Sequence, residues 1–244
     1  MEDKKEKTKL KIREALAFGW KKTNQRLRFF IVASSIFAIG PLLITLPIDI
    51  AVALTEGLLS QLLTVFSILA YSILFMFFIA GFWTILLKTL REERPAFRDF
   101  LGKWKYVPRL VGGYILYFLA VFIGLILFIV PGLILLARLY FFDLLIIDKG
   151  MGPIQALKES YTMTKGYGWK IFLLVFVIIP AVFLLWTMIF LIGLLDTFLS
   201  LVIFRGIVFL IGMLVAIPIF YLASVFFYGK LSNREAESTP VEVS

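Results

Sequence analysis

The chain contains no cysteine and no histidine. It therefore cannot form disulfides, use a thiol nucleophile, or hold haem or a metal ion through thiolate or imidazole groups. Charged residues are also scarce, at 17% of the 244 residues, whereas a soluble domain carries about a quarter. The sequence has no Walker loop, dinucleotide fingerprint, HExxH motif or nucleophile elbow. Nothing in it points to a cofactor or to a particular reaction.

Hydrophobic residues are abundant instead, and make up 61% of the chain. They occur in long uncharged runs, each close to the ~20 residues that a helix needs to cross a bilayer core of about 30 Å. The runs do not alternate apolar and polar residues, as the strands of a membrane barrel would. We therefore predict an all-α, polytopic membrane protein with six transmembrane helices. The predicted spans are residues 29–48, 62–87, 110–130, 132–147, 171–195 and 206–228.

The rest of the chain divides into flanking segments and connectors. Ile12, Leu16 and Trp20 recur at helical spacing near the N-terminus, which favours a helix lying on the membrane surface. Phe18 interrupts that apolar stripe. The predicted domains are a basic, amphipathic cytoplasmic segment at 1–28, a six-span membrane domain at 29–229, and a polar, disordered cytoplasmic tail at 230–244.

The distribution of basic residues predicts the topology. Of the 25 Lys and Arg residues, 23 lie in residues 1–28, 88–109, 148–170 and 230–244. Because basic segments stay in the cytoplasm, we expect both termini and both long connectors there, in a prokaryotic plasma membrane. Residues 110–147 are either a hairpin that turns at Pro131-Gly132 or one bent helix. A single crossing would put two basic connectors on opposite sides, so the hairpin is favoured.

The two long connectors carry amphipathic patterns that predict helices in the membrane plane. The first covers residues 95–105 and the second residues 153–165, and each begins with proline, which suits a first helical turn. The apolar stripes are Phe97, Phe100, Leu101 and Trp104 in the first, and Ile154, Leu157 and Tyr161 in the second, with Lys158, Glu159, Thr162 and Lys165 facing the other way. The tryptophans that lie beside lysines are expected at the membrane interface; these are Trp20, Trp104 and Trp169.

Three charges in or beside the fourth predicted span are the candidate site residues: Arg138, Asp143 and Asp148. A charge at bilayer depth costs about 2.5–3.5 kcal/mol on insertion scales, so it should face the protein interior and have a partner. Arg138 and Asp143 are five residues apart, or about 140° around a helix, so they should not pair directly. Asp49, Glu56 or Asp196 could reach Arg138, and Arg109 or Lys170 could reach Asp143. A buried pair that locks helices together and a functional charge are both open interpretations.

Residues 128–180 resemble a known pattern. The matching residues are Val130-Pro131-Gly132, Arg138-Leu139-Tyr140, Asp148, Ala156-Leu157, Ser160, Gly166 and Trp169. The segment resembles the six-span families that include YciC-like inner-membrane proteins, and the membrane domain attached to some glycerophosphodiester phosphodiesterases. The resemblance implies a six-helix membrane domain of unsettled function. It does not imply the phosphodiesterase activity, because that activity belongs to a separate barrel domain.

We therefore expect a non-enzymatic membrane scaffold, or a module that binds lipids or protein partners, without a cofactor. Its expected partners are membrane lipids, the anionic head groups of the inner leaflet, and a second copy or another membrane protein, but not nucleic acid. The alternative is a small transporter or channel for a solute or lipid, with a pathway near Arg138. A membrane-embedded enzyme acting on lipid head groups is the third class. A wet cavity at Arg138 would favour transport, paired charges a scaffold, and converging carboxylates an enzyme.

Overall fold

The structure, a computed structural model, describes residues 10–101, 103–174 and 199–238. Within these residues the protein is all-helical and no strand occurs, which confirms the predicted all-α class. Five helical stretches are long and apolar enough to cross a membrane: Leu27–Ala53, Gly57–Leu90, Phe97–Leu127, Ile129–Lys149 and Leu214–Arg234. They fit a multi-pass membrane protein. The predicted span at 171–195 lies almost entirely outside the described residues.

The N-terminal helix α1 (Ile12–Gln25) packs along the C-terminal helix α9 (Leu199–Ser238). Its buried face consists of the small residues Ala15, Gly19 and Thr23, and a side chain at Gly19 would run into the backbone of α9 at Ile219. The predicted membrane-facing stripe is divided, because Ile12 and Leu16 pack against the core while Trp20 stays exposed. The helix was predicted correctly, and its buried face was not.

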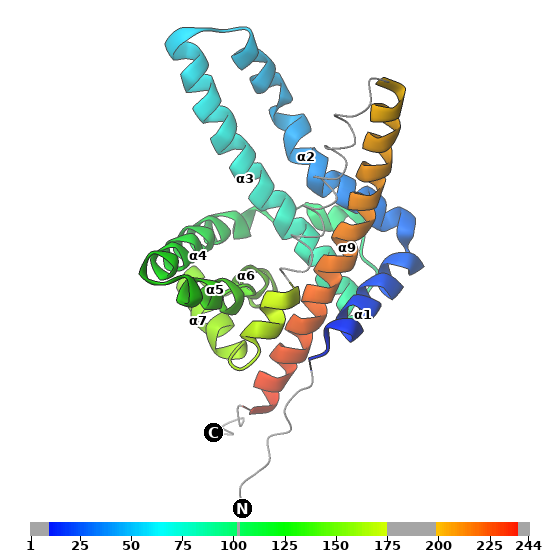
Figure 1. Cartoon of the computed structure of the whole chain (residues 1–244), viewed down its shortest axis with the longest axis vertical. Coiled ribbons are helices and arrows are strands. Elements are labelled where there is room, and N and C mark those ends of the chain that lie inside the picture. Colours follow the sequence, from blue (N-terminus) through cyan, green and yellow to red (C-terminus); the bar gives the residue numbers. More distant parts are fainter. Residues whose placement is uncertain (1–9, 102, 175–198, 239–244) are drawn as a thin grey trace, which may run out of the picture.

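Helices α2 (Leu27–Ala53) and α3 (Gly57–Leu90) form a long hairpin that extends beyond the rest of the protein (Figure 1). Pro41 and Pro47 lie inside α2, and the helix continues past residue 48, where the predicted first span ends. The connector is therefore shorter than predicted. At 34 residues, α3 is about 51 Å long, well over the bilayer core of about 30 Å.

The prediction of a membrane-plane helix at residues 95–105 is wrong. Two short 3-10 turns occur there instead, η1 (Phe97–Phe100) and η2 (Trp104–Tyr106). The Asp99 carboxylate accepts a hydrogen bond from the Ala96 backbone N–H at 2.8 Å and binds Lys88 at 2.7 Å. A side chain that binds its own backbone in this way competes with a regular helix. The apolar stripe is also divided, because Phe100 is buried and Leu101 is exposed.

Helices α4 (Val107–Leu127) and α5 (Ile129–Arg138) are antiparallel neighbours, so the hairpin prediction is correct. The turn lies at Phe128, three residues before the predicted Pro131-Gly132. Gly124 and Gly132 allow the two helices to touch, since a Cβ atom on Gly124 would lie 3.0 Å from the Gly132 Cα. The predicted fourth span is two helices, because the chain breaks after Arg138 and continues as α6 (Phe142–Lys149).

The helix predicted in the second connector is present as α7 (Pro153–Met163). Its buried residues are Ala156, Leu157, Ser160 and Met163, whereas Ile154 and Tyr161 of the predicted apolar stripe are exposed. Helix α9 begins at Leu199, inside the predicted outer connector, and continues to Ser238. The tail predicted as disordered from residue 230 is therefore helical as far as residue 238.

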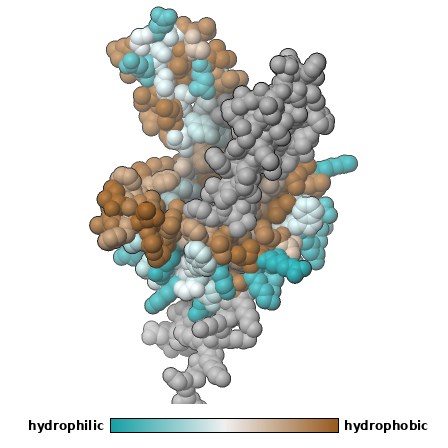
Figure 2. Space-filling view, in the orientation of Figure 1, coloured by the Kyte–Doolittle hydropathy of each residue, from teal (hydrophilic) through white to brown (hydrophobic). Residues whose placement is uncertain are grey.

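The core lies where α2, α3, α6 and α9 meet. Its largest buried side chains include Phe30, Phe82, Trp83 and Phe227. In the described residues, apolar surface predominates on the α2–α3 hairpin below its tip and on the α4–α5 pair, while polar surface gathers at the hairpin tip and toward the lower part of the molecule (Figure 2). This separation is what a bilayer requires of a protein that spans it.

Candidate functional site

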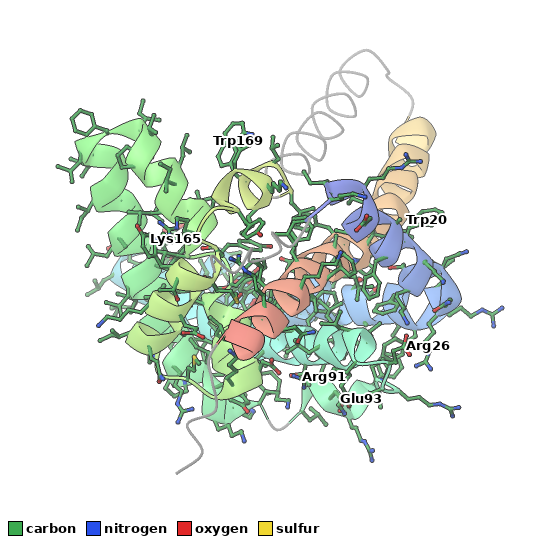
Figure 3. The ribbon with its side chains drawn as sticks, turned by 90° about the horizontal axis from the view of Figure 1, so that it is seen from below. Trp20, Arg26, Arg91, Glu93, Lys165 and Trp169 are labelled. Carbon is green, nitrogen blue, oxygen red and sulfur yellow. The ribbon has the colours of Figure 1, made fainter. Side chains whose placement is uncertain are left out.

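The four basic segments meet at one end of the structure, which we call the charged end (described residues 10–28, 88–109, 148–170 and 230–234). Their contacts connect segments far apart in the sequence: Lys22–Glu92 at 3.1 Å, Lys230–Glu14 at 3.1 Å, Arg91–Asp148, and Arg109 Nη1 to the Gly150 carbonyl at 2.7 Å. Figure 3 shows labelled side chains from three of the segments on this end. The arrangement agrees with the placement of all four segments on one side of a membrane.

One of these contacts has an electrostatic signature. Hydrogen bonds from Lys11 and Lys230 hold the pKa of Glu14 below its usual value. Glu14 is exposed, so the interaction is screened by solvent. It nevertheless joins the first turn of α1 to the last part of α9 and therefore helps fix the register between the two helices.

Asp143 lies at the centre of the protein and is 4% exposed. Its Oδ2 atom accepts hydrogen bonds from Trp83 Nε1 at 2.8 Å and from the Tyr114 hydroxyl at 3.0 Å. Its Oδ1 atom accepts one from the Leu144 backbone N–H at 2.8 Å. The predicted pairing of Asp143 with Arg109 or Lys170 is wrong, because this carboxylate accepts its hydrogen bonds from three neutral donors. The three bonds connect α3, α4 and α6.

Asp148 makes a second connection between helices, nearer the charged end. It pairs with Arg91 after the end of α3, and it accepts a hydrogen bond from the Tyr228 hydroxyl of α9 at 2.8 Å. Tyr228 is 2% exposed. The carboxylate therefore joins α3, α6 and α9, and both of its oxygen atoms have a partner.

Arg138 does not contact a carboxylate among the described residues. Its Nη2 atom donates to the Tyr161 carbonyl at 2.7 Å, and its guanidinium lies 3.3 Å from the centre of the Tyr161 ring. Its Nε atom is buried and has no hydrogen-bond partner. The expected pairing with Asp49 or Glu56 is wrong, because Arg138 lies beside α7 of the charged end; Asp196 lies outside the described residues. As predicted, Arg138 and Asp143 do not pair with each other.

The break between α5 and α6 explains why Arg138 lies against α7. The Ser160 hydroxyl donates to the Arg138 carbonyl at 2.9 Å and accepts from the Phe141 N–H at 3.2 Å. The Thr164 hydroxyl also donates to the Arg138 carbonyl at 2.9 Å. Backbone groups freed by a helix break need partners in a membrane protein, and here α7 supplies them.

An apolar groove of about 460 Å³ opens beside Arg138, which we call the Arg138 groove. One wall is α5, and the other is the segment that follows α7. It is lined by Val130, Leu133, Ile134, Ala137, Arg138, Gly166, Gly168, Trp169 and Phe172. Gly166 has φ +85°, and a Cβ atom on Gly168 would lie 3.4 Å from the Arg138 Cγ. Glycine at these positions therefore lets the second wall turn and approach the arginine closely.

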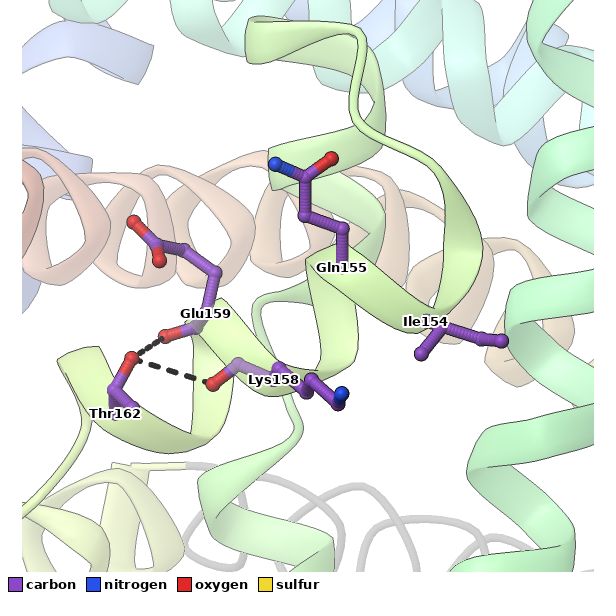
Figure 4. Close-up of a pocket in the computed structure, with 5 residues that line it drawn as sticks. All are labelled: Ile154, Gln155, Lys158, Glu159 and Thr162. Carbon is purple, nitrogen blue, oxygen red and sulfur yellow. Dashed lines mark hydrogen bonds between the residues drawn. The ribbon is translucent and has the colours of Figure 1, made fainter.

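A second hollow, of about 430 Å³, lies on the outer face of α7 (Figure 4). Ile154, Gln155, Lys158, Glu159 and Thr162 line it. The Thr162 hydroxyl binds carbonyls of its own helix, and Glu159 lies 3.6 Å from Lys149. Thr162 and Glu159 thus have local partners, and none of the five side chains has a buried polar atom without a partner, as Arg138 has, so the hollow is a weaker candidate site than the Arg138 groove.

The three tryptophans predicted at the interface are all exposed, at 59% for Trp20, 52% for Trp104 and 68% for Trp169. Trp104 stacks on Phe77 with ring centres 4.5 Å apart, and Trp169 stacks on Phe172 at 5.2 Å. Trp20 and Trp104 belong to the charged end, and Trp169 also lines the Arg138 groove. Their placement agrees with the interfacial role that the sequence indicates, which stays a prediction.

Sequence reasoning overlooked the donors that serve the two carboxylates, namely Trp83, Tyr114 and Tyr228. The position of Trp83 gave no signal of this role, because it lies four residues before the end of the predicted span 62–87 and five before Lys88, where an interfacial tryptophan is also expected. Its chemistry did give one. A buried indole N–H needs an acceptor, so a span containing tryptophan and a span containing aspartate are natural partners.

In comparisons with protein-family models, curated proteins and solved structures, nothing matches this chain. The resemblance to YciC-like families therefore stays a prediction. The residues that carry it do meet in space: Ser160 binds the Arg138 carbonyl, Gly166 and Trp169 line the same groove as Arg138, and Asp148 follows on α6.

Proposed function

We propose that this protein is a non-enzymatic membrane scaffold that binds anionic lipids at its charged end. The observation that carries this proposal is the bonding of Asp143, whose carboxylate is filled by donors from three helices. A charge that lined a solute pathway would need to exchange partners with water or substrate. Asp143 instead holds neighbouring helices together through buried hydrogen bonds, and Asp148 does the same closer to the surface.

The carboxylates also argue against an enzyme acting on lipid head groups. Asp99, Asp143 and Asp148 each bind a different set of partners rather than converging on one space. Catalysis by general acid and base requires such groups to reach one substrate together.

We place the charged end at the cytoplasmic face of a prokaryotic plasma membrane, with a sixth span within residues 171–195. The support is the contact between four segments that hold 23 of the 25 basic residues. Each Lys or Arg near an anionic leaflet contributes about 1 kcal/mol of attraction. A second copy or another membrane protein is the partner that we expect on the apolar helices.

The test uses the full chain in vesicles of phosphatidylcholine and phosphatidylglycerol with spin-labelled lipids. A larger fraction of phosphatidylglycerol than of phosphatidylcholine should be motionally restricted, and added salt should reduce the difference. Equal fractions of the two lipids would refute binding of anionic lipids at the charged end.

Lipid transport is the second candidate, favoured by the opening of an apolar groove beside Arg138. The same vesicles separate it from a scaffold. With fluorescent phosphatidylglycerol and an impermeant quencher, a scaffold leaves the inner-leaflet signal intact, as in vesicles without protein. Loss of the inner-leaflet signal, dependent on the protein, would establish transport instead.

A further inference from the structure

The Arg138 groove combines an apolar wall with an incompletely satisfied cation. Val130, Ile134 and Arg138 line it at intervals of four residues along α5, so they follow one side of the helix. The lined stretch of α5 is about 12 Å long at 1.5 Å per residue. An occupant that fits must therefore be elongated and apolar, with a polar group at one end only.

The polar group must be an anion that accepts hydrogen bonds. Arg138 has a neutral carbonyl and an aromatic ring as partners, so no carboxylate among the described residues balances its charge. Its Nε–H is buried without an acceptor. A guanidinium presents several N–H donors in one plane, which matches the oxygen atoms of a phosphate.

The surroundings add positive charge. Lys165 and Lys170 flank the lining segment that contains Gly166, Gly168 and Trp169. In the part of the chain that the structure describes, neither lysine pairs with a carboxylate, and both are exposed. Trp169 provides an exposed aromatic face of the kind that settles at the level of lipid head groups.

We propose that the Arg138 groove binds one anionic glycerophospholipid, with an acyl chain along α5 and the phosphate at Arg138. This inference rests on the proposed lipid-binding function and gives it a single specific site. It differs from general attraction to the charged end, because one lipid would exchange slowly and depend on one arginine. The lipid phosphate would balance the charge of the guanidinium, which no carboxylate among the described residues balances.

The probe is dioleoylphosphatidylglycerol, added to delipidated full-length protein in detergent and followed by native mass spectrometry. One molecule should bind per chain, more tightly than dioleoylphosphatidylcholine. Arg138→Gln removes the guanidinium and should weaken binding about tenfold, the loss expected for one charge-assisted hydrogen bond. The comparison variant is Arg109→Gln, which removes one charge from the charged end but none from the groove, and which also breaks a 2.7 Å bond to a backbone carbonyl, so it should weaken binding less than Arg138→Gln.

A second pair of variants tests the groove without touching a charge. Ile134 lines the groove, and Ile123 lies on α4 outside it, and each is 48% exposed. Ile134→Trp should fill the groove and reduce binding at least as much as Arg138→Gln, while Ile123→Trp should bind like the parent. This pair decides the matter if Arg138→Gln does not fold.

Three results would overturn the site. The first is equal binding of phosphatidylglycerol and phosphatidylcholine. The second is an equal loss of phosphatidylglycerol binding in a groove variant and in its control. The third is full displacement of phosphatidylglycerol by glycerol 3-phosphate, which would make the occupant a free anion. If the vesicles still show salt-sensitive selectivity for phosphatidylglycerol while Ile134→Trp binds the lipid normally, the Arg138 groove is not the binding site. Binding of anionic lipids at the charged end would then still stand. If the vesicles show no selectivity at all, the proposed function itself fails.

Discussion

Replacing Asp143 with leucine tests whether the central carboxylate locks the helices together. The change leaves the Trp83 N–H and the Tyr114 O–H without their acceptor, in a part of the protein where Asp143 is 4% exposed. A buried donor without a partner costs about 1–3 kcal/mol. Hydrogen bonds between side chains in membrane proteins average only about 0.6 kcal/mol, so the lower part of that range applies. Asp143→Leu should therefore lower the free energy of unfolding by about 2–4 kcal/mol.

The assay is unfolding in mixed micelles, monitored by circular dichroism, with a double-mutant cycle. Trp83→Phe removes one of the stranded donors, so the double variant should lose less than the sum of the two single losses. Asp143→Asn should cost less than leucine, because its amide oxygen still accepts a hydrogen bond. Asp49→Leu is the matched control, since among the described side chains only Ser67 donates to Asp49. The locking role would be refuted if Asp143→Leu were as stable as the parent, or if its effect and that of Trp83→Phe were strictly additive.

Three further predictions concern packing, charge and orientation. Gly124→Leu should cost about 1–3 kcal/mol of overpacking in the same unfolding assay, because a Cβ atom there would lie 3.0 Å from the facing backbone of α5; parental stability would contradict the close approach. The depressed pKa of Glu14 stabilises the folded state above the ordinary pKa of a glutamate, and this contribution is lost as the pH falls through the folded value. The protection factors of the α1 amides, which correct for the pH dependence of intrinsic exchange, should therefore fall on acidification, and Lys230→Gln should remove part of that fall. A cysteine at Glu56 should react with an impermeant reagent added outside intact cells and one at Lys103 should not, and the reverse pattern would invert the topology.

Much of the helical architecture could be predicted from hydropathy and charge. The long apolar runs locate α2, α3 and α4 because length and polarity alone decide whether a segment can cross a bilayer. The need to keep two basic connectors on one side predicted the α4–α5 hairpin correctly. Its turn was misplaced because proline and glycine signal a turn, yet Pro131 is tolerated in the first turn of α5.

The faces and ends of helices were harder to predict than their existence. The spacing of Phe97, Phe100 and Trp104 fits a helix, but Asp99 binds its own backbone and favours 3-10 turns. In α7 the buried positions include Ser160, because its hydroxyl serves a helix break elsewhere in the chain. Periodicity records only which residues are apolar and contains no information about a distant backbone group in need of a partner.

The partners of the buried charges could not be read from the sequence for a related reason. A basic residue seemed the natural partner for Asp143, yet Trp83 and Tyr114 satisfy it through neutral hydrogen bonds. Aromatic residues are so frequent here, at 16% of the chain, that a tryptophan or tyrosine serving a carboxylate looks like any other. Only the packing of α3 and α4 against α6 distinguishes them.

Helix α7 connects the charged end to the Arg138 groove through its hydrogen bonds. The helix belongs to the charged end, and on one side its Glu159 lies 3.6 Å from Lys149. On the other side its Ser160 and Thr164 hydroxyls bind the Arg138 carbonyl, and its Tyr161 carbonyl binds the Arg138 side chain. A displacement of α7 therefore has to disturb the bonds that orient Arg138, because Ser160 and Thr164 supply the partners of the Arg138 carbonyl and Ser160 that of the Phe141 N–H. Anionic lipid that attracts the charged end and anionic lipid bound in the groove would act on the same helix, so their binding free energies should be coupled.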